Sequence, residues 1–513
     1  MQDGIVTFEK IFVKTFPFKI ITQMKKQLSL GLLLLLVHVF VQAQQFKISY
    51  SPEVFNKPFT GKLFLYMSKN SPEPKEGSVG MEFFPCFSID AANVKPGGFV
   101  VIDDKANAFP VKLSDIERGE YYVQAVWDRN LGGRSIASSA GNIFSKPEKI
   151  IITKDYEKTF NIVCKEVVAD PVFKETNFIK ELRVSSSLLT SFQKKQMTVD
   201  AAVILPIEYY TEPQRKFPVL FVVSGYGGDY HYYSGDSVTR SKAIDSIPCI
   251  TVYLDGNCSL GHSVYANSDN NGPWGDALVQ EFIPLLETKY RCNGARLLRG
   301  HSSGGWTVLW LQTQYPASFA GCWSSSPDPV DFRNFSGVNL YEGENLYYDK
   351  KGGLRSVATV AGRIPWASVK MAYQAEQVIY RGEQMHSFDA VFGAKGADGN
   401  PESICNSVTG ELNKKAFEHW KSYDISLYLR SNWPDLKNNL DGKIRVSVGE
   451  QDNFLLNEPV HLLEAEMKKV NAAMLFEYFP GDHFTVGTPE YRAKGFHFLA
   501  ERYKVWESTN TKK

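Results

Sequence analysis

The sequence has almost no net charge, since 57 lysines and arginines stand against 56 aspartates and glutamates. Without residues 1–43 the balance is 52 against 54, a formal charge of −2. A surface that binds nucleic acid or an anionic membrane normally carries a clear basic excess. The charge therefore gives no support to either partner, and we expect neither nucleic acid nor a stable membrane anchor.

The sequence also lacks the paired CxxC spacing of a metal site, and its cysteine count is odd. We predict that most of the cysteines are buried thiols. A Cys249–Cys258 disulfide is the alternative if the chain is exported. No metal and no organic cofactor is implied by the pattern. The seven cysteines are Cys86, Cys164, Cys249, Cys258, Cys292, Cys322 and Cys405.

No apolar run reaches the length of about 20 residues that a transmembrane helix needs. The stretch from Met24, "MKKQLSLGLLLLLVHVFVQAQQ", has a basic start, a shorter apolar run and a small residue, Ala43, at its end. These are the parts of a secretory signal. We predict that the chain starts at Met24, is cut after Ala43, and is secreted or periplasmic. No cysteine follows the cut, which argues against a lipid anchor.

Residues 45–168 contain short strand-like runs between Gly, Pro, Asn and Asp turns. Apolar positions alternate with polar ones, as in Phe46, Ile48 and Tyr50. This alternation, rich in β-branched and aromatic residues, predicts an N-terminal all-β sandwich of antiparallel strands. Trp127 is a candidate for stacking on sugars, although packing in the core is the favoured interpretation. The strand-like runs are "FKISYS", "GKLFLYMS", "EYYVQAVW", "KIIITK" and "FNIVCKEVV".

Residues 176–507 have a different sequence pattern, in which predicted strands alternate with predicted helices. "VDAAVILP", "FPVLFVVSG" and "IPCITVYLDG" are apolar runs suited to strands that are covered on both faces. "GDALVQEFIPLLETKYR" then has helical spacing. The pattern predicts a mostly parallel α/β sheet with helices on both faces. The alternation lapses over residues 327–432, which we interpret as an insertion or lid that contributes to the substrate pocket.

A GxSxG turn follows one of the predicted strands. In Gly300-His301-Ser302-Ser303-Gly304 the pattern fits Ser302 as nucleophile, because Ser303 has a histidine two positions before it. A sharp strand-to-helix turn presents the serine hydroxyl at the carboxyl edge of the sheet. The backbone N–H of Ser303 then starts the helix, where an oxyanion can be stabilised.

A serine nucleophile needs a base and a carboxylate that orients the base. Of the nine histidines, His483 lies in a loop directly after a late apolar strand. Asp452 follows the preceding strand, which gives the chain order Ser, Asp, His of an α/β-hydrolase. Glu450 is the competing carboxylate. His386 and His419, in the insertion, stay open as substrate contacts or surface residues.

The second oxyanion donor is expected after an earlier strand, in "FVVSGYGGDYHYY". Its glycines let the backbone approach the substrate, so the N–H of Tyr226 or Gly227 is the candidate. The neighbouring aromatic side chains are candidates for lining a cleft that suits sugars or aromatic acyl groups. These candidate substrate contacts are Tyr230, Tyr232, Tyr233 and, on the helix after the nucleophile, Trp306.

The segments "AAVILPIEYY", "KFPVLFVVSGYGG", "RGHSSGGW", "VGEQDNF" and "PGDHF" together resemble the putative esterase, or esterase D-like, family of α/β-hydrolases. That family includes feruloyl, acetyl xylan and siderophore esterases, S-formylglutathione hydrolases and mycolyltransferases. The resemblance covers about residues 178–326 and 433–505. It implies Ser302, Asp452 and His483 as the triad, with Tyr226 and Ser303 as oxyanion donors. The sequence departs from the family at Ser224, where a histidine is usual.

The expected function is hydrolysis of a carboxylic ester through an acyl-enzyme, on a feruloylated or acetylated carbohydrate. A siderophore lactone esterase and an acyltransferase are alternatives on the same residues. An alternative of another class is a non-catalytic carbohydrate-binding surface protein on a hydrolase scaffold. A peptidase is disfavoured because the N-terminal part lacks visible propeller repeats.

Overall fold

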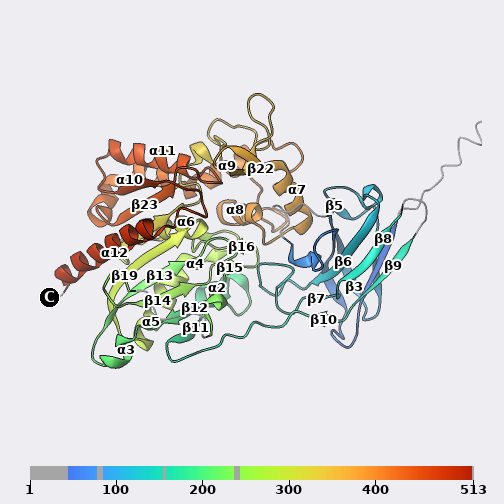
Figure 1. Ribbon diagram of the computed structural model, residues 1–513, viewed down its shortest axis with the longest axis horizontal. Coiled ribbons are helices and arrows are strands. Elements are labelled where there is room, and N and C mark those ends of the chain that lie inside the picture. The colour runs from blue at the N-terminus through green and yellow to red at the C-terminus, as the bar shows by residue number, and fades with distance from the viewer. Residues whose placement is uncertain (1–43, 78–84, 154–157, 236–242, 511–513) are drawn as a thin grey trace, which may run out of the picture.

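The structure, a computed structural model, describes residues 44–77, 85–153, 158–235 and 243–510. The predicted export signal, residues 1–43, lies outside these ranges. Within them, none of the helices combines the length and the apolar character needed to cross a bilayer. Figure 1 shows two bodies, an N-terminal β region and a larger α/β region, with the helices α7 and α8 between them.

The N-terminal β region consists of two sheets. In the smaller one β1 (Gln45–Tyr50) pairs antiparallel with β4 (Phe99–Ile102) and parallel with β9 (Thr159–Cys164). The parallel pair departs from the antiparallel prediction, because β1 and β9 are distant in sequence and no hairpin dictates their direction. The larger sheet has the order β10-β7-β6-β2-β3-β5, with β8 also paired to β6. Its strands are β2 (Phe59–Ser68), β3 (Cys86–Val94), β5 (Asn107–Phe109), β6 (Gly119–Asp128), β7 (Ile143–Phe144), β8 (Glu148–Ile152) and β10 (Glu166–Val167).

Trp127 lies in the core of this region. Its side chain is fully buried, and its ring meets Tyr50 edge-on at a centroid distance of 5.1 Å and Phe59 at 4.9 Å. Tyr50 belongs to the smaller sheet and Phe59 to the larger one, so the indole helps to hold the two sheets together. The favoured interpretation of Trp127 as a core residue is confirmed.

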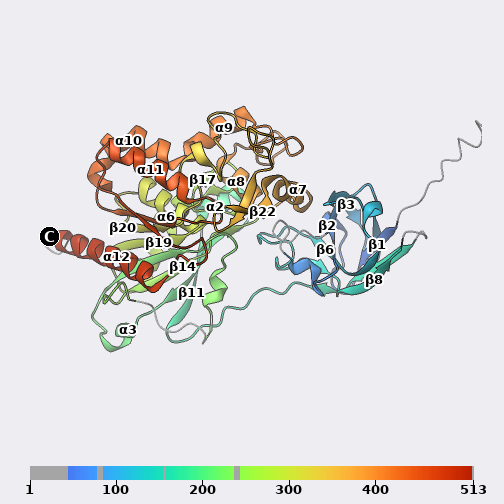
Figure 2. The same cartoon turned by 45° about the horizontal axis from the view of Figure 1, so that its top comes forward.

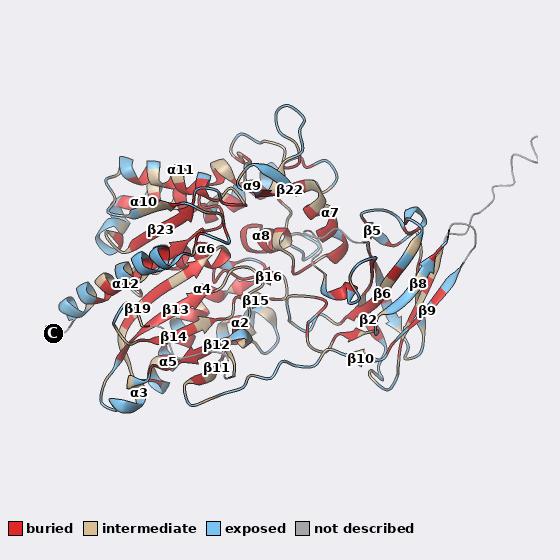
Figure 3. Ribbon diagram, in the orientation of Figure 1, coloured by how far each residue is buried: buried red, intermediate tan, exposed pale blue. Residues whose placement is uncertain are grey.

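The α/β region is built on a sheet of eight strands in the order β11-β12-β14-β13-β19-β20-β23-β24. β11 and β12 pair antiparallel with their neighbours, and all pairs from β14 to β24 are parallel. The inner strands β13 and β23 are buried along their whole length (Figure 3). The bounds are β11 (Ile179–Ser185), β12 (Thr198–Ile204), β13 (Phe217–Val223), β14 (Ile250–Leu254), β19 (Cys292–His301), β20 (Gly321–Ser325), β23 (Ile444–Gly449) and β24 (Leu475–Phe479).

Both faces of this sheet are covered, as the apolar strands predict. In β13, Leu220 and Val222 belong to the core cluster that includes Leu499 of α12 (Pro489–Asn510), whereas Phe221 and Val223 face the cluster of α6 (Ser303–Gln314). The other helices of the region are α2 (Ser187–Gln193), α3 (Glu208–Thr211), α4 (Trp274–Asp276), α5 (Ile283–Lys289) and α11 (Asn457–Lys469). Alternate residues of one strand therefore fill two separate cores.

The predicted insertion, residues 327–432, carries its own elements. Helix α10 (Ile425–Leu440) crosses the predicted boundary at residue 432, so the insertion has no sharp end there. Tyr380 adopts a left-handed conformation with φ 62°, which splits the helical pattern around it into α7 and α8. The remaining elements are β21 (Ser356–Val360), β22 (Ile364–Ser368), α7 (Val369–Ile379), α8 (Gln384–Phe392) and α9 (Lys414–Trp420).

Helix α7 packs against the N-terminal β region, and the turned view of Figure 2 shows the same neighbourhood. Val378 and Ile379 of the helix share an apolar cluster with Phe64 and Tyr66 of β2. The insertion thus joins the two bodies through a core of its own.

All seven cysteines are free thiols, and all except the half-buried Cys292 are buried. Burial as thiols is what the odd count and scattered spacing predict. The alternative, a Cys249–Cys258 disulfide, is not formed.

Candidate active site

Ser302 occupies a strained turn between β19 and α6, with φ 60° and ψ −127°. A non-glycine residue keeps such a backbone conformation only where the surroundings enforce it. The flanking glycines show how: a Cβ on Gly300 would lie 2.0 Å from the carbonyl oxygen of Gly304, and one on Gly304 would lie 2.0 Å from that of Val223. The GxSxG glycines are therefore required by close backbone contacts.

Ser303 begins helix α6, and its side chain turns toward Asp328. Its hydroxyl donates to Asp328 Oδ2 at 2.6 Å, and the Asp328 amide donates to the Ser302 carbonyl oxygen at 3.3 Å. Burial raises the pKa of Asp328 to about 6, opposed by the hydrogen bond from Ser303. Sequence reasoning missed Asp328, whose only signal is its place shortly after β20, a strand next to the nucleophile's own.

His483 lies in the loop between β24 and α12 and contacts Asp452. Its Nδ1 is 2.7 Å from Asp452 Oδ2, and its amide donates to Asn453 Oδ1 at 3.1 Å. The two residues are 4% and 0% exposed. Glu450 instead lies 3.3 Å from His461 Nε2 near the surface. Of the two candidate carboxylates, Asp452 is the one that meets the histidine.

His301, directly before the predicted nucleophile in sequence, packs against the ring of the predicted base. Its ring centroid is 4.6 Å from that of His483, and its Nδ1 is 2.9 Å from Ser325 Oγ. Burial, with the charge of His483 as the next cause, lowers the pKa of His301 to about 4, so the ring is neutral near pH 7. Across the described ranges, Ser302 Oγ makes no hydrogen bond to His483, a contact that often forms only with substrate bound.

The loop after β13 lies beside Ser302. A Cβ built on Gly225 would be 3.2 Å from Ser302 Cβ and 3.8 Å from its Oγ. Gly227 has φ +81°, and the Gly228 amide donates to the Gly225 carbonyl at 3.0 Å to close the turn. The structure therefore brings the loop that carries Tyr226 and Gly227, the predicted donors, beside the nucleophile at Gly225.

His262 supports this loop where the sequence departs from the family pattern. The imidazole hydrogen-bonds the backbone of Ser224. Burial lowers the pKa of His262 to about 4, with the charge of Arg134 as a further cause. A neutral histidine from another segment thus lies against Ser224, where the family usually has a histidine in the loop itself.

Several predicted substrate contacts lie elsewhere. Trp306 is 1% exposed and stacks on Trp310 inside the core, which corrects its predicted place in a cleft. Tyr230 is 4% exposed and donates to Glu181 Oε1 at 2.7 Å, so its hydroxyl is turned to strand β11.

The two remaining predicted tyrosines differ in exposure. Tyr232 is 71% exposed, and Tyr233 stacks on Tyr253 of β14 at a centroid distance of 3.5 Å. In the insertion, His419 Nδ1 bonds the Phe392 carbonyl oxygen at 2.7 Å, and His386 lies 3.8 Å from Glu376.

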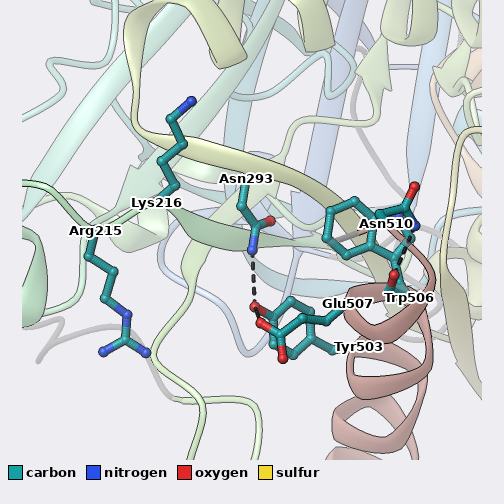
Figure 4. Close-up of a pocket in the computed structure, with 7 residues that line it drawn as sticks. All are labelled: Arg215, Lys216, Asn293, Tyr503, Trp506, Glu507 and Asn510. Atoms are coloured by element: carbon teal, nitrogen blue, oxygen red, sulfur yellow. Dashed lines mark hydrogen bonds between the residues drawn. The ribbon is translucent and has the colours of Figure 1, made fainter. Parts of the chain in front are cut away.

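A cavity of about 420 Å³, whose lining is drawn in Figure 4, lies near the amino ends of β13 and β19. Ser302 lies at the other end of these strands. Arg215 and Lys216, which line it, precede β13, and Asn293 lies near the start of β19, whereas Ser302 follows the end of β19. This cavity is therefore separate from the nucleophile. Within the described ranges, no three metal-ligating side chains lie together in one group. The other lining residues are Tyr503, Trp506, Glu507 and Asn510 of α12.

A family model described as "Putative esterase" matches residues 193–489, more than half of the chain. The match contains Ser302, Asp452 and His483. The chain belongs to the putative esterase family. As a member of this family it has the α/β-hydrolase fold and is a carboxylic ester hydrolase. The family match begins after the N-terminal β region.

Solved structures similar to this family member include three esterases. A ferulic acid esterase is 15% identical with a TM-score of 0.37, covering 65% of this chain and 98% of its own. An S-formylglutathione hydrolase from Agrobacterium tumefaciens is 14% identical with a TM-score of 0.36, over 64% and 97%. Est1E from Butyrivibrio proteoclasticus is 11% identical with a TM-score of 0.34, over 63% and 99%. No curated protein matches the chain.

Proposed function

We propose that the protein is an exported serine esterase whose triad is Ser302, His483 and Asp452. The observation that carries this proposal is the 2.7 Å contact between His483 Nδ1 and Asp452 Oδ2, made by two buried side chains. The His483 ring also packs against the ring of His301, which directly precedes Ser302 in the strained turn. A buried carboxylate on Nδ1 selects the tautomer that leaves Nε2 free to accept a proton.

In this mechanism Ser302 Oγ attacks the ester carbonyl carbon while its proton passes to His483 Nε2. The tetrahedral oxyanion accepts hydrogen bonds from the backbone N–H groups of Ser303 and of Tyr226 or Gly227. His483 then gives the proton to the leaving alkoxide, which breaks the ester bond and leaves an acyl-enzyme. A water molecule, deprotonated by His483, attacks the acyl group and releases the acid with regeneration of Ser302.

The proposed substrate is a carbohydrate-linked feruloyl or acetyl ester outside the cytoplasm. Two phenylalanines favour an aromatic acyl group: Phe454 meets the His483 ring at 4.9 Å, and Phe484, 65% exposed, meets it at 5.4 Å. Flat apolar faces beside the base suit a phenolic ring. The predicted export signal supports a polymer substrate that cannot enter the cell.

The test compares the chain from residue 44 with its Ser302→Ala variant on methyl ferulate, acetylated xylan and a catecholate lactone. We expect turnover of a ferulate ester that is lost in the variant. Equal turnover in both proteins would refute the triad, and no turnover in either would favour a binding protein. Preference for the lactone, or transfer of the acyl group to an added sugar instead of water, would support the siderophore esterase or the acyltransferase.

A further inference from the structure

Arg134 of the N-terminal β region reaches the loop that carries the proposed oxyanion donors. Its Nη1 donates to the Tyr226 hydroxyl at 2.7 Å, and its guanidinium lies over the Tyr226 ring at 4.6 Å from the centroid. A Cβ on Gly227 would lie 3.5 Å from Arg134 Nη2. One side chain thus holds both the ring and the hydroxyl of Tyr226 and borders the next residue of the loop.

The segment that carries Arg134 is itself fixed by a buried ion pair. Arg381 pairs with Asp128 at 2.6 Å, and the two side chains are 1% and 0% exposed. Arg381 also donates to the carbonyl oxygens of Gly133 at 2.7 Å and of Arg134 at 3.1 Å. The backbone around Arg134 is therefore tied to the insertion, so the guanidinium is presented from a rigid base.

The insertion completes the surroundings of the Tyr226 hydroxyl. Arg134 Nη1 also donates to the Gly382 carbonyl at 3.0 Å, and the hydroxyl donates to that same oxygen. A Cβ on Gly382 would meet the Arg134 carbonyl at 2.1 Å, so only glycine permits this approach. Burial raises the pKa of nearby Glu383 to about 7, and the charge of Arg134 opposes that shift. Three distant segments thus meet at one hydroxyl group.

We propose that Arg134 is a positioning residue that sets the oxyanion loop through the Tyr226 side chain, so that turnover requires the N-terminal β region. This inference rests on the proposed triad and oxyanion donors. An oxyanion donor contributes mainly in the transition state, and only if its N–H is held in place. Loss of the Arg134 anchor therefore lowers kcat and leaves substrate binding nearly unchanged.

The experiment measures kcat and KM for Arg134→Gln, Tyr226→Phe and the double variant on p-nitrophenyl acetate. We expect each single variant to lower kcat about 10- to 100-fold with little change in KM. The double variant should be no worse than the poorer single one, because both break the same contact. Arg129→Gln is the matched control, since Arg129 stacks on Phe55 within the N-terminal β region, and it should keep full activity.

The inhibition constant of a trifluoromethyl ketone is a second measurement, and it should stay unchanged in the variants if Arg134 has a purely structural role. Ser302 adds to the carbonyl of the ketone and creates an oxyanion, so the inhibition constant should weaken by the same factor as kcat/KM. Thermal midpoints monitor folding, and Tyr226→Phe keeps the aromatic ring for the case in which Arg134→Gln does not fold. Unchanged kcat in both single variants, a rise in KM alone, or fully additive effects would overturn the role of Arg134. Full activity in Ser302→Ala would instead refute the triad.

Discussion

Asp128, at the end of β6, and Arg381, just after α7, form a buried ion pair. The guanidinium makes two hydrogen bonds to the carboxylate, at 2.6 and 2.8 Å, and Tyr380 donates a third at 2.7 Å. Burial by itself would raise the pKa of Asp128, but the hydrogen bond and charge of Arg381 outweigh it and lower the pKa. The pair joins the N-terminal β region to the insertion with both charges compensated.

Removal of one partner leaves the other charge buried and unpaired. Arg381→Met or Asp128→Asn should each lower the free energy of unfolding by about 3–5 kcal/mol in urea titrations. Lys350→Met is the control, since Lys350 pairs with Glu342 at the surface, with side chains 73% and 58% exposed. A control of this kind should change the free energy by about 0–1 kcal/mol. Equal effects would mean that the buried pair is not a main tie between the two bodies.

Asp328 should make the free energy of unfolding decrease as the pH rises from about 4 to about 6. Its pKa is raised from 3.8 to about 6, so the folded state holds the proton more tightly than the unfolded chain. The stability linked to this proton is present below the unfolded pKa and is lost as the pH rises to the folded pKa.

Asp328→Asn removes the buried charge and keeps an acceptor for the Ser303 hydroxyl. We expect the thermal midpoint of the variant, relative to that of the wild type, to increase as the pH rises from 4 to 7. Asp349→Asn, at an exposed position, serves as the comparison. A constant difference between Asp328→Asn and the wild type across this range would show that Asp328 does not titrate as described.

The elbow glycines should not tolerate even a methyl group. Gly300→Ala places a carbon 2.0 Å from a backbone oxygen that cannot move aside, so the unfolding free energy should drop by about 1–3 kcal/mol. Its kcat should fall as well, because Ser302 shifts. Gly487→Ala is the matched variant, with Arg492 Nη1 as its nearest contact at 3.7 Å. Urea titrations and ester turnover of both variants would reveal the difference, and wild-type behaviour of Gly300→Ala would contradict the tight elbow.

Asp452→Asn should lower kcat about 10⁴-fold with a small change in KM, because an amide favours the wrong tautomer of His483. Glu450→Gln, two residues away, should behave like the wild type, since Glu450 faces His461. Steady-state hydrolysis of p-nitrophenyl acetate measures both. Comparable losses in the two variants would mean that the carboxylates share the role.

Much of the fold was predictable because its signals are local. Alternating apolar residues predicted β1, and buried β-branched runs predicted β13, since each pattern reports which faces of a strand are covered. The glycines around Ser302 predicted a tight turn for the same reason. The break at Tyr380 and the extent of α10 were not predictable, because long-range packing decides where a helical pattern bends or ends.

The substrate contacts were the weakest predictions. Tyr230 and Trp306 lie close in sequence to the proposed oxyanion loop and nucleophile, yet both side chains are buried away from solvent. Proximity in sequence sets neither the direction nor the exposure of a side chain.

The sequence by itself determined the strand-turn-helix at Ser302 and the order in which Asp452 and His483 follow, because glycine spacing and strand patterns act over a few residues. Only the tertiary structure decided that Asp452 rather than Glu450 meets His483, and that Arg134 touches Tyr226. The physical reason is that both contacts join segments brought together by burial across the whole chain, where local periodicity carries no information.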